Sequence, residues 1–332
     1  MGPLNPGKLP HGLLEKLIGL RGAEDPRVFV GPKLGEDCAV IDLGDAFLVL
    51  KADPVTFVTG RAGAYAVHVN ANDVASMGAR PRWFEAVLLC PAGTGEKEVQ
   101  GLFAQIDETA RALDIAVVGG HTEITPAVMH PVVVGSMQGL VAKNRLVTSS
   151  GVRPGDFIVM TKVAGLEGTA VLLQEKPQEA ARALGQEGLA EARRLVGALG
   201  ISVVQEALMA AVHGVHAMHD VTEGGVATAL FELAYASSVQ ILVNPEAIPV
   251  LDATRQLCAH FGIEPMGLLG SGGLLIALSK QDLPKVQEAF RVRGFLAKLI
   301  GEASEGEGVY ALRGNKKVSL PIYEQDELTK VL

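Results

Sequence analysis

Apolar positions in the first half of the chain alternate between helical and extended spacing. Leu13, Leu14 and Leu17 recur at helical spacing and predict a short amphipathic helix. The helices expected in this half are 10–20, 63–77 and 96–113, and the strands expected are 38–41, 47–50, 83–90, 115–118 and 132–141. The core stripe expected on the third helix is Val99, Leu102, Phe103, Ile106, Ala110 and Leu113. The apolar strand 115–118 is expected to be buried and to end in a turn at Gly119-Gly120.

Turn-forming residues gather at 149–156 and predict a boundary between two domains, 1–150 and 151–332. In the second domain the expected strands are 157–161, 216–218, 241–243 and 274–278, followed by two short closing strands. The expected helices there are 168–173, 189–195, 203–212, 225–236, 254–261 and 282–294. Because helices and strands alternate in both halves, the fold class is expected to be α/β or α+β with two domains.

The chain of 332 residues is longer than a single hydrophobic core usually supports, which also favours two domains. Apolar residues make up 48% of it, as in a globular protein with a large core. The formal net charge of −8 argues against general affinity for nucleic acid or for an anionic membrane. We therefore expect neither as a partner.

Three widely spaced cysteines, Cys38, Cys90 and Cys258, form no CxxC motif and cannot all pair with one another. A reducing cytoplasm is the simplest setting for them. The N-terminal segment lacks the apolar core of a secretory signal, and no stretch is expected to reach the ~18 apolar residues of a membrane-spanning helix. The sequence thus predicts a soluble, cytoplasmic protein.

Several carboxylates stand at the ends of apolar runs, beside small residues. They are Asp37, Asp53, Asp73, Glu123 and Asp220. Carboxylates beside glycine turns suit hard divalent cations, and glycine lets the backbone approach a phosphate closely. These segments together predict a Mg²⁺–nucleotide site. Since the sequence contains no Walker A loop, we expect the site to be assembled from distant parts of the chain.

Asp73 is the most informative of these residues. Together with Asn70 and Asn72 it lies inside a predicted helix, although Asn and Asp are poor residues for a helix interior. Asn70 and Asp73 are three positions apart and share a helical face, so a common polar site is expected there. The alternative is an irregular turn or a helix cap at Asn72-Asp73.

Two further segments combine a strand with glycines and a carboxylate. Gly119-Gly120 leads to Glu123 after a strand, which is where α/β proteins commonly place ligands. Asp220 precedes Gly224-Gly225 at the expected start of a helix, whose free N–H groups can bind phosphate. Taken locally, each has a simpler explanation: a turn in the first case, and an N-cap formed by Asp220 or Thr222 in the second.

The order of the motifs carries more information than any one of them. They occupy 35–41, 53–54, 72–81, 118–123, 155–156, 161–162, 165–169 and 219–225. In this order they resemble the superfamily of ATP-binding enzymes that contains aminoimidazole ribonucleotide (AIR) synthase. The resemblance is closest to the hydrogenase-maturation branch, through 65–73, 81–84 and the triplet His121-Thr122-Glu123.

The resemblance implies roles for particular residues. Those implied to approach Mg²⁺ and the ATP phosphates are Asp37, Asp53, Asp73, Glu123 and Asp220, with Asp73, Lys162 and Asp220 as catalytic residues and Lys162 neutralising phosphate charge. Those implied to bind the nucleotide are Gly35, Asp37, Asn72, Gly119, Gly120, Thr122 and Thr161. The resemblance further implies a homodimer in which two N-terminal domains form an interfacial β-barrel.

The shared chemistry of the superfamily is activation of an oxygen in an amide, carboxamide or similar group by the γ-phosphate of ATP. The alternatives are a small-molecule kinase resembling thiamine-monophosphate kinase and a non-catalytic ATP-binding maturation factor that docks a partner protein. The related dehydratase carries its carbamoyl group on a C-terminal cysteine, whereas the last cysteine here is Cys258, so we expect no thiocarboxamide by that route. His121 follows the two glycines where some relatives have a carboxylate, which leaves Glu123 as the expected ligand.

Overall fold

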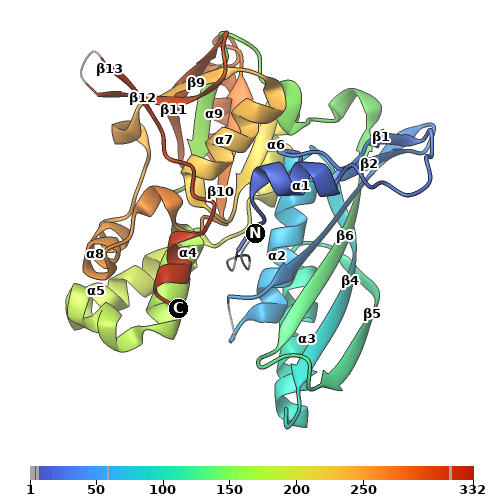
Figure 1. Ribbon diagram of the computed structural model, residues 1–332, viewed down its shortest axis with the longest axis vertical. Coiled ribbons are helices and arrows are strands. Elements are labelled where there is room, and N and C mark those ends of the chain that lie inside the picture. Colours follow the sequence, from blue (N-terminus) through green and yellow to red (C-terminus); the bar gives the residue numbers. More distant parts are fainter. Residues whose placement is uncertain (1–3, 5–6, 58–59, 314–315) are drawn as a thin grey trace.

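Two sheets, one from each half of the chain, form the frame of the structure (Figure 1). The computed structural model describes residue 4 and residues 7–57, 60–313 and 316–332. Six strands of the first half pair into one sheet, and seven strands of the second half pair into the other. The expected class is confirmed: this is a two-domain α/β fold with two mixed sheets. Two short 3₁₀ turns, η1 (Lys143–Arg145) and η2 (Ser149–Gly151), lie in the segment of the chain that connects the first sheet to the second.

The first sheet is mostly antiparallel. Its strands are β1 (Val28–Val30), β2 (Ala39–Asp42), β3 (Ala46–Val55), β4 (Arg80–Pro91), β5 (Ala116–Thr125) and β6 (Val132–Ala142). They are arranged in the order β1-β2-β3-β6-β4-β5, and only the pair β4 and β5 is parallel. The apolar pattern did not predict β1, which is only three residues long.

The second sheet has the order β13-β12-β9-β11-β7-β10-β8. Its strands are β7 (Phe157–Thr161), β8 (Ala217–Val221), β9 (Gln240–Val243), β10 (Gly273–Leu278), β11 (Ala297–Ser304), β12 (Gly308–Arg313) and β13 (Lys316–Ser319). Every residue of β8 and β10 is buried, although β8 is the last strand of this sheet, because α2 (Ala62–Ser76), α7 (Gly225–Ser237) and η2 pack against it. The last three strands along the chain are β11, β12 and β13, where the sequence pattern predicted two closing strands.

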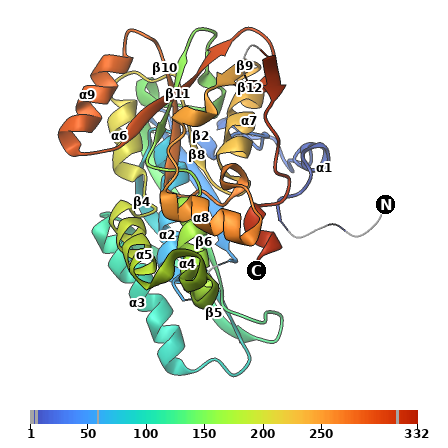
Figure 2. The same cartoon turned by 90° about the vertical axis from the view of Figure 1, so that its left-hand side faces the viewer.

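Helices cover both faces of the second sheet and cluster below it (Figure 2). They are α4 (Leu166–Glu175), α5 (Pro177–Leu199), α6 (Val204–Ala211), α7 (Gly225–Ser237), α8 (Asp252–Phe261) and α9 (Leu283–Arg293), with short turns η3 (Pro245–Ala247), η4 (Pro265–Gly267) and η5 (Glu327–Lys330). α4, α5 and α8 pack against one another and form the cluster below the sheet.

Two helices cover one face of the first sheet: α2 (Ala62–Ser76) and α3 (Glu96–Ala112). α2 lies at the junction of the two domains, because it contacts β3, β4 and β6 on one side and α6 and β8 on the other. On α3, Leu102, Ile106 and Ala110 are buried as expected. Phe103 is 52% exposed, so its place in the expected core stripe is wrong. It follows Leu102 by one position, which turns it about 100° away from the buried face.

β5 differs from the prediction in two ways. It continues through Gly119 and Gly120 to Thr125, so there is no turn at the glycines. The reason is its parallel partner β4, whose long pairing with β5 keeps the backbone extended. β5 is also exposed along nearly its whole length, and it forms the edge of the sheet. The expectation of a buried strand here is wrong.

One apolar stretch, 177–211, has the length and composition of a membrane-crossing helix, and 39% of its most apolar segment of 18 residues is buried inside the protein. The expectation that no stretch would qualify is wrong by this measure, because residues 195–211 contain a single charged residue, Glu206. The stretch is not one straight helix, since Gly185 has non-helical angles and residues 200–203 separate α5 from α6. A core helix passes the same test, so the stretch is weak evidence for a membrane span.

The N-terminal helix α1 (His11–Leu17) packs on the second domain, although the chain continues from it into the first sheet. The ring of His11 stacks on Phe231 of α7 with centroids 5.0 Å apart. The hydroxyl of Tyr235, also on α7, donates a hydrogen bond of 2.9 Å to Glu15. These contacts hold α1 against α7.

Candidate functional site

Three of the expected carboxylates come together from three separate segments. Asp37 lies in the loop before β2, Asp73 on α2 and Asp220 on β8. Carboxylate oxygens of the three lie within 4.8 Å of one another. Asp73 and Asp220 are buried, and Asp37 is partly buried. The cluster therefore joins the first domain to the second.

The electrostatics of the cluster favour a cation. Burial, and then the charge of Asp220, raise the pKa of Asp73 well above its usual value. Burial, and then the charge of Asp37, raise the pKa of Asp220 to about 7. The Oδ2 atoms of Asp73 and Asp220 are buried and have no hydrogen-bond partner in the described part of the chain. Close carboxylates with free oxygens are the donor set that Mg²⁺ takes in proteins, so the residues fit that ion.

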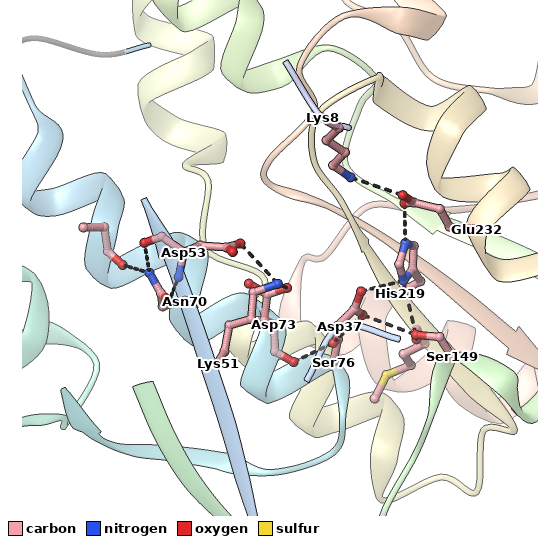
Figure 3. Close-up of polar contacts among 12 residues, drawn as sticks. Lys8, Asp37, Lys51, Asp53, Asn70, Asp73, Ser76, Ser149, His219 and Glu232 are labelled. Atoms are coloured by element: carbon pink, nitrogen blue, oxygen red, sulfur yellow. Dashed lines mark hydrogen bonds and ion pairs between the residues drawn. The ribbon is translucent and has the colours of Figure 1, made fainter. Parts of the chain in front are cut away.

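Lys51 connects the cluster to Asp53. Its Nζ lies 3.2 Å from a carboxylate oxygen of Asp53 and 3.2 Å from one of Asp73 (Figure 3). Burial by itself lowers the pKa of Lys51, but the charges of Asp73 and Asp53 outweigh it and hold the pKa well above its usual value. Lys51 and Asp53 are two positions apart on β3 and so share the face that looks toward α2. The sequence reasoning included Asp53 but missed Lys51.

The polar residues of α2 lie in a regular helix, so the alternative of an irregular turn at Asn72-Asp73 is wrong. Asn70 clamps β3: its Oδ1 accepts a 2.9 Å hydrogen bond from the N–H of Asp53. Asn72 clamps the second domain: its Nδ2 donates 2.8 Å to the carbonyl of Ile201, and its Oδ1 accepts 2.8 Å from the N–H of Val203. Asp73 alone of the three contributes to the acidic cluster.

A second chain of charges holds Asp37 in place, and the sequence reasoning missed its other members. His219 Nδ1 lies 2.7 Å from Asp37, and its Nε2 lies 3.1 Å from Glu232 of α7 (Figure 3). Burial alone would lower the pKa of His219, but the charges and hydrogen bonds of Asp37 and Glu232 raise it well above the usual value. Lys8, in the segment before α1, lies 3.2 Å from Glu232. Ser76 donates a 3.0 Å hydrogen bond to Asp37.

The structure places Lys162 outside the acidic cluster. It follows Thr161, the last residue of β7, and its Nζ lies 3.3 Å from Glu206 of α6. The same Nζ donates a hydrogen bond of 3.1 Å to the carbonyl of Gly200. Burial lowers the pKa of Lys162, against the opposing charge of Glu206. The hydroxyl of Thr161 accepts a hydrogen bond from the N–H of Leu274 at 3.1 Å.

The β5 residues expected at the site lie on the exposed edge of the first sheet. Gly119, Gly120, Thr122 and Glu123 are all exposed, and Glu123 is not among the carboxylates that cluster in the described chain. Its Oε2 lies 3.3 Å from Nε2 of His121 on the same strand. Within one chain, β5 is therefore separated from the acidic cluster.

The start of α7 settles the alternative explanation of Asp220. The N-cap is Gly224, which has a left-handed conformation, and no side chain of its own segment caps the helix. Its N–H instead donates a 2.8 Å hydrogen bond to Asp326, far along the chain. Neither Asp220 nor Thr222 caps α7, so the capping explanation is wrong. Gly35, with a φ of 82°, lies against α7, where a Cβ would come within 2.7 Å of the carbonyl oxygen of Glu232.

Two protein-family models match the chain, and together they span most of it. The model described as AIR synthase related protein, N-terminal domain, matches residues 35–141. The model described as AIR synthase related protein, C-terminal domain, matches residues 153–312.

Three relatives match 86% or more of this chain. A Methanocaldococcus jannaschii protein named for hydrogenase expression and formation is 27% identical over 328 residues, 95% of either chain. The carbamoyl dehydratase HypE of Cupriavidus necator is 28% identical and is matched over 86% of this chain and 78% of its own length. The thiamine-monophosphate kinase of Pyrococcus abyssi is 24% identical, over 89% of this chain and 90% of its own.

Solved structures show the same fold. The structure of HypE in complex with ATP superposes with a TM-score of 0.70 at 22% identity and covers 96% of each chain. The HypE–HypF complex gives a TM-score of 0.76 at 19% identity, over 94% of this chain and 100% of the other. At identities this low, the likeness shows the fold alone.

Proposed function

Because the chain belongs to the AIR synthase-related family, we propose that it is a Mg²⁺-dependent enzyme that uses ATP. In this proposal it transfers the γ-phosphoryl group to an amide- or carboxamide-like oxygen of a small substrate. The observation that carries the proposal is the convergence of Asp37, Asp73 and Asp220, with two buried carboxylate oxygens left free of partners. These three residues are the Mg²⁺ ligands we assign.

Other residues keep the charge of the site in balance. Lys51 offsets the charges of Asp53 and Asp73, and the His219 cation offsets that of Asp37. A site with less negative charge accepts the anionic ATP more readily. Lys8 is 38% exposed beside Glu232 and can reach an incoming phosphate. Lys162, Thr161 and the β5 residues keep their implied roles as expectations only, since they lie apart from the cluster in a single chain.

The chemistry follows from this arrangement. Bound Mg²⁺ supplies positive charge that stabilises the phosphoryl group during transfer. The substrate oxygen forms a bond to the γ-phosphorus, the bond to the β–γ bridging oxygen breaks, and ADP leaves. Once phosphorylated, the substrate oxygen becomes a good leaving group. A second step can then expel it as phosphate.

Binding of ATP tests the proposal. Isothermal titration should show ATP binding that requires Mg²⁺ and is lost in Asp73→Asn, which removes one of the clustered charges. Asp107→Asn is the matched control, because Asp107 is an exposed carboxylate of α3 paired with Arg111. Binding that ignores Mg²⁺, or that survives in the Asp73 variant, would overturn the proposal.

A kinase is the second candidate, and the similarity to thiamine-monophosphate kinase favours it. The two activities share the acidic cluster and differ in whether phosphate stays on the product. Phosphorus NMR of the turnover mixture separates them. A stable phosphorylated product identifies the kinase, and release of inorganic phosphate with a dehydrated or cyclised product identifies the first activity.

A third candidate is a nucleotide-binding maturation factor that docks a partner protein, as the HypE–HypF complex shows for that relative. Nucleotide-dependent capture of a partner without any ATP turnover would favour it.

The cysteines bear on the compartment in which the protein works. Cys38, Cys90 and Cys258 are buried and none of them forms a disulfide, which fits a reducing compartment such as the cytoplasm.

We also propose a homodimer formed through the first sheet, with domains 1–150 and 151–332 in each protomer. The edge strand β5 is exposed over nearly its full length, and the apolar side chains of Val117, Val118 and Ile124 lie on it. An exposed apolar edge strand is a surface that proteins usually cover. A second copy would cover it and complete the expected barrel.

A further inference from the structure

A cavity of about 560 Å³ lies between the two domains, on a different face of α2 from Asp73. Its walls are the first half of α2, the end of α4, and α5 with the residues that follow it. The volume is in the range that holds a small organic molecule. None of the residues that line it carries a negative charge.

The α2 wall presents two polar side chains, His68 and Tyr65. Nδ1 of His68 is buried and has no hydrogen-bond partner among the described residues. Tyr65 also lines the cavity and is only 8% exposed. Buried polar atoms are nearly always paired in folded proteins, so the unpaired Nδ1 of His68, a residue of the cavity wall, is a candidate ligand contact.

Two arginines make the cavity positive. Arg61, at the start of α2, has no acidic partner in the described chain, and Arg193 of α5 uses one nitrogen to donate a 3.1 Å hydrogen bond to the carbonyl of Leu173. Burial, and then the charges of Arg61 and Lys162, lower the pKa of His68 to about 4. His68 is therefore neutral at pH 7 and can donate or accept a hydrogen bond without adding charge.

We propose that this cavity binds the small substrate by an oxyanion, a carboxylate or a phosphate, held between Arg61 and Arg193, with Tyr65 and His68 as hydrogen-bonding partners. Arginine is the side chain best suited to bidentate binding of such groups. Calling the ligand the substrate rests on the proposed function; the binding itself does not.

The cavity is close to the acidic cluster. His68 and Asp73 are five residues apart on α2, which is about 7.5 Å along the helix axis. Glu167, at the start of α4, links the two places electrostatically. Burial, and then the charge of Glu167, raise the pKa of Tyr65, and Asp220 is among the charges that raise the pKa of Glu167 after burial. A group bound at the arginines would therefore lie within about two helical turns of the acidic cluster.

Titration of the full chain with inorganic phosphate and with succinate tests the site. We expect at least one probe to bind, and Arg193→Gln and Arg61→Gln each to weaken it about tenfold. Arg194→Gln is the matched control, since Arg194 is the next residue of α5 and its side chain is 70% exposed. Which probe binds more tightly distinguishes phosphate from carboxylate.

Two further readouts keep the test decisive. The Mg²⁺-dependent ATP affinity of the arginine variants should match that of the wild type, which shows that they are folded. The His68 side-chain nitrogen resonances should shift when the probe binds. The inference is overturned if neither probe binds below about 10 mM, or if the arginine variants bind as the control does. If the wild type binds a probe but does not bind ATP, the proposed function is overturned and this site still stands.

Discussion

Single residues at the acidic cluster balance stability against binding. Asp73 and Asp220 are buried with like charges near by, and each keeps one oxygen without a partner. Such an arrangement destabilises the fold unless a proton or a cation neutralises it. Natural proteins keep strain of this kind mainly where binding requires it.

The free energy of unfolding of the cation-free protein should fall as the pH rises from about 4 to above 7. The folded pKa of Asp220 is about 7 against a usual value of 3.8, so the folded state holds an extra proton in this window and loses its advantage as the proton leaves. His219 acts in the same direction at higher pH. Its pKa is raised by Asp37 and Glu232 against the effect of burial, so its stabilisation is complete below about 6.5 and is lost progressively as the pH rises from there toward the raised folded pKa. Thermal unfolding in EDTA between pH 5 and 8 measures the slope.

Mg²⁺ and one variant identify the source of that slope. Asp220→Asn should raise the free energy of unfolding at pH 8 by about 1–3 kcal/mol and flatten the pH profile. Mg²⁺ should stabilise the wild type at pH 8 and have much less effect on the variant. Identical pH profiles for the two proteins would show that Asp220 does not carry a raised pKa.

At the scale of elements, α2 performs several tasks with neighbouring residues. Asn70 holds β3, Asn72 holds the second domain and Asp73 enters the acidic cluster. Successive positions of a helix point about 100° apart, which is why consecutive polar residues serve different neighbours. The first half of the same helix lines the cavity.

Asn72→Ala should destabilise the protein by about 2–4 kcal/mol, because it leaves the buried carbonyl of Ile201 and the N–H of Val203 without partners. The gain in helix propensity from alanine is smaller, at about 0.5 kcal/mol. Chemical denaturation measures the difference. Asn144→Ala, at an exposed position in η1, is the control and should change little. Equal effects of the two substitutions would argue against the clamp.

Gly120→Ala should destabilise the first sheet by about 3 kcal/mol or more. Gly120 has a φ of 149°, and a Cβ there would lie 2.0 Å from the carbonyl oxygen of Ala86 on β4. Gly101→Ala is the matched control: it lies on α3 with open space around it and should stabilise by about 0.5–1 kcal/mol. Denaturation midpoints of the two variants should therefore move in opposite directions. A tolerated alanine at Gly120 would refute the tight pairing of β4 and β5.

At the scale of the whole molecule, the acidic cluster and the cavity both lie where the two domains meet. The cluster takes two residues from the first domain and one from the second, and the cavity is walled by helices of both. A change in the angle between the domains would therefore alter both places together. The edge of the first sheet, in contrast, faces away from this junction (Figure 1).

Val118→Asp should shift the proposed homodimer toward monomer. Val118 is 53% exposed on β5, so the charge disturbs an interface while leaving the core of the protomer intact. Val292→Asp is the matched control, because Val292 is 70% exposed on α9 in the other domain. Sedimentation velocity measures the mass. A wild type that stays monomeric at high concentration, or a Val118 variant that stays dimeric, would contradict the proposed interface.

Local patterns in the sequence were enough for most helices and strands. Helical spacing placed α2, α3 and α7, and apolar runs placed β3, β4, β6 and β10, because these elements bury one face or both and the burial is visible in the order of residues. The same reasoning failed at β5. Its apolar residues resemble those of a buried strand, but they lie on an exposed edge, and exposure depends on what packs against a strand rather than on its sequence.

The sequence by itself determined the family and three members of the acidic cluster, Asp37, Asp73 and Asp220, because motif order is preserved along the chain. Only the tertiary structure decided which polar residues act together. It separated Lys162 and Glu123 from the cluster, joined Lys51 and His219 to it, and revealed the cavity beside His68. The physical reason is that contacts between residues far apart in the chain depend on how two domains pack, and no local pattern records that packing.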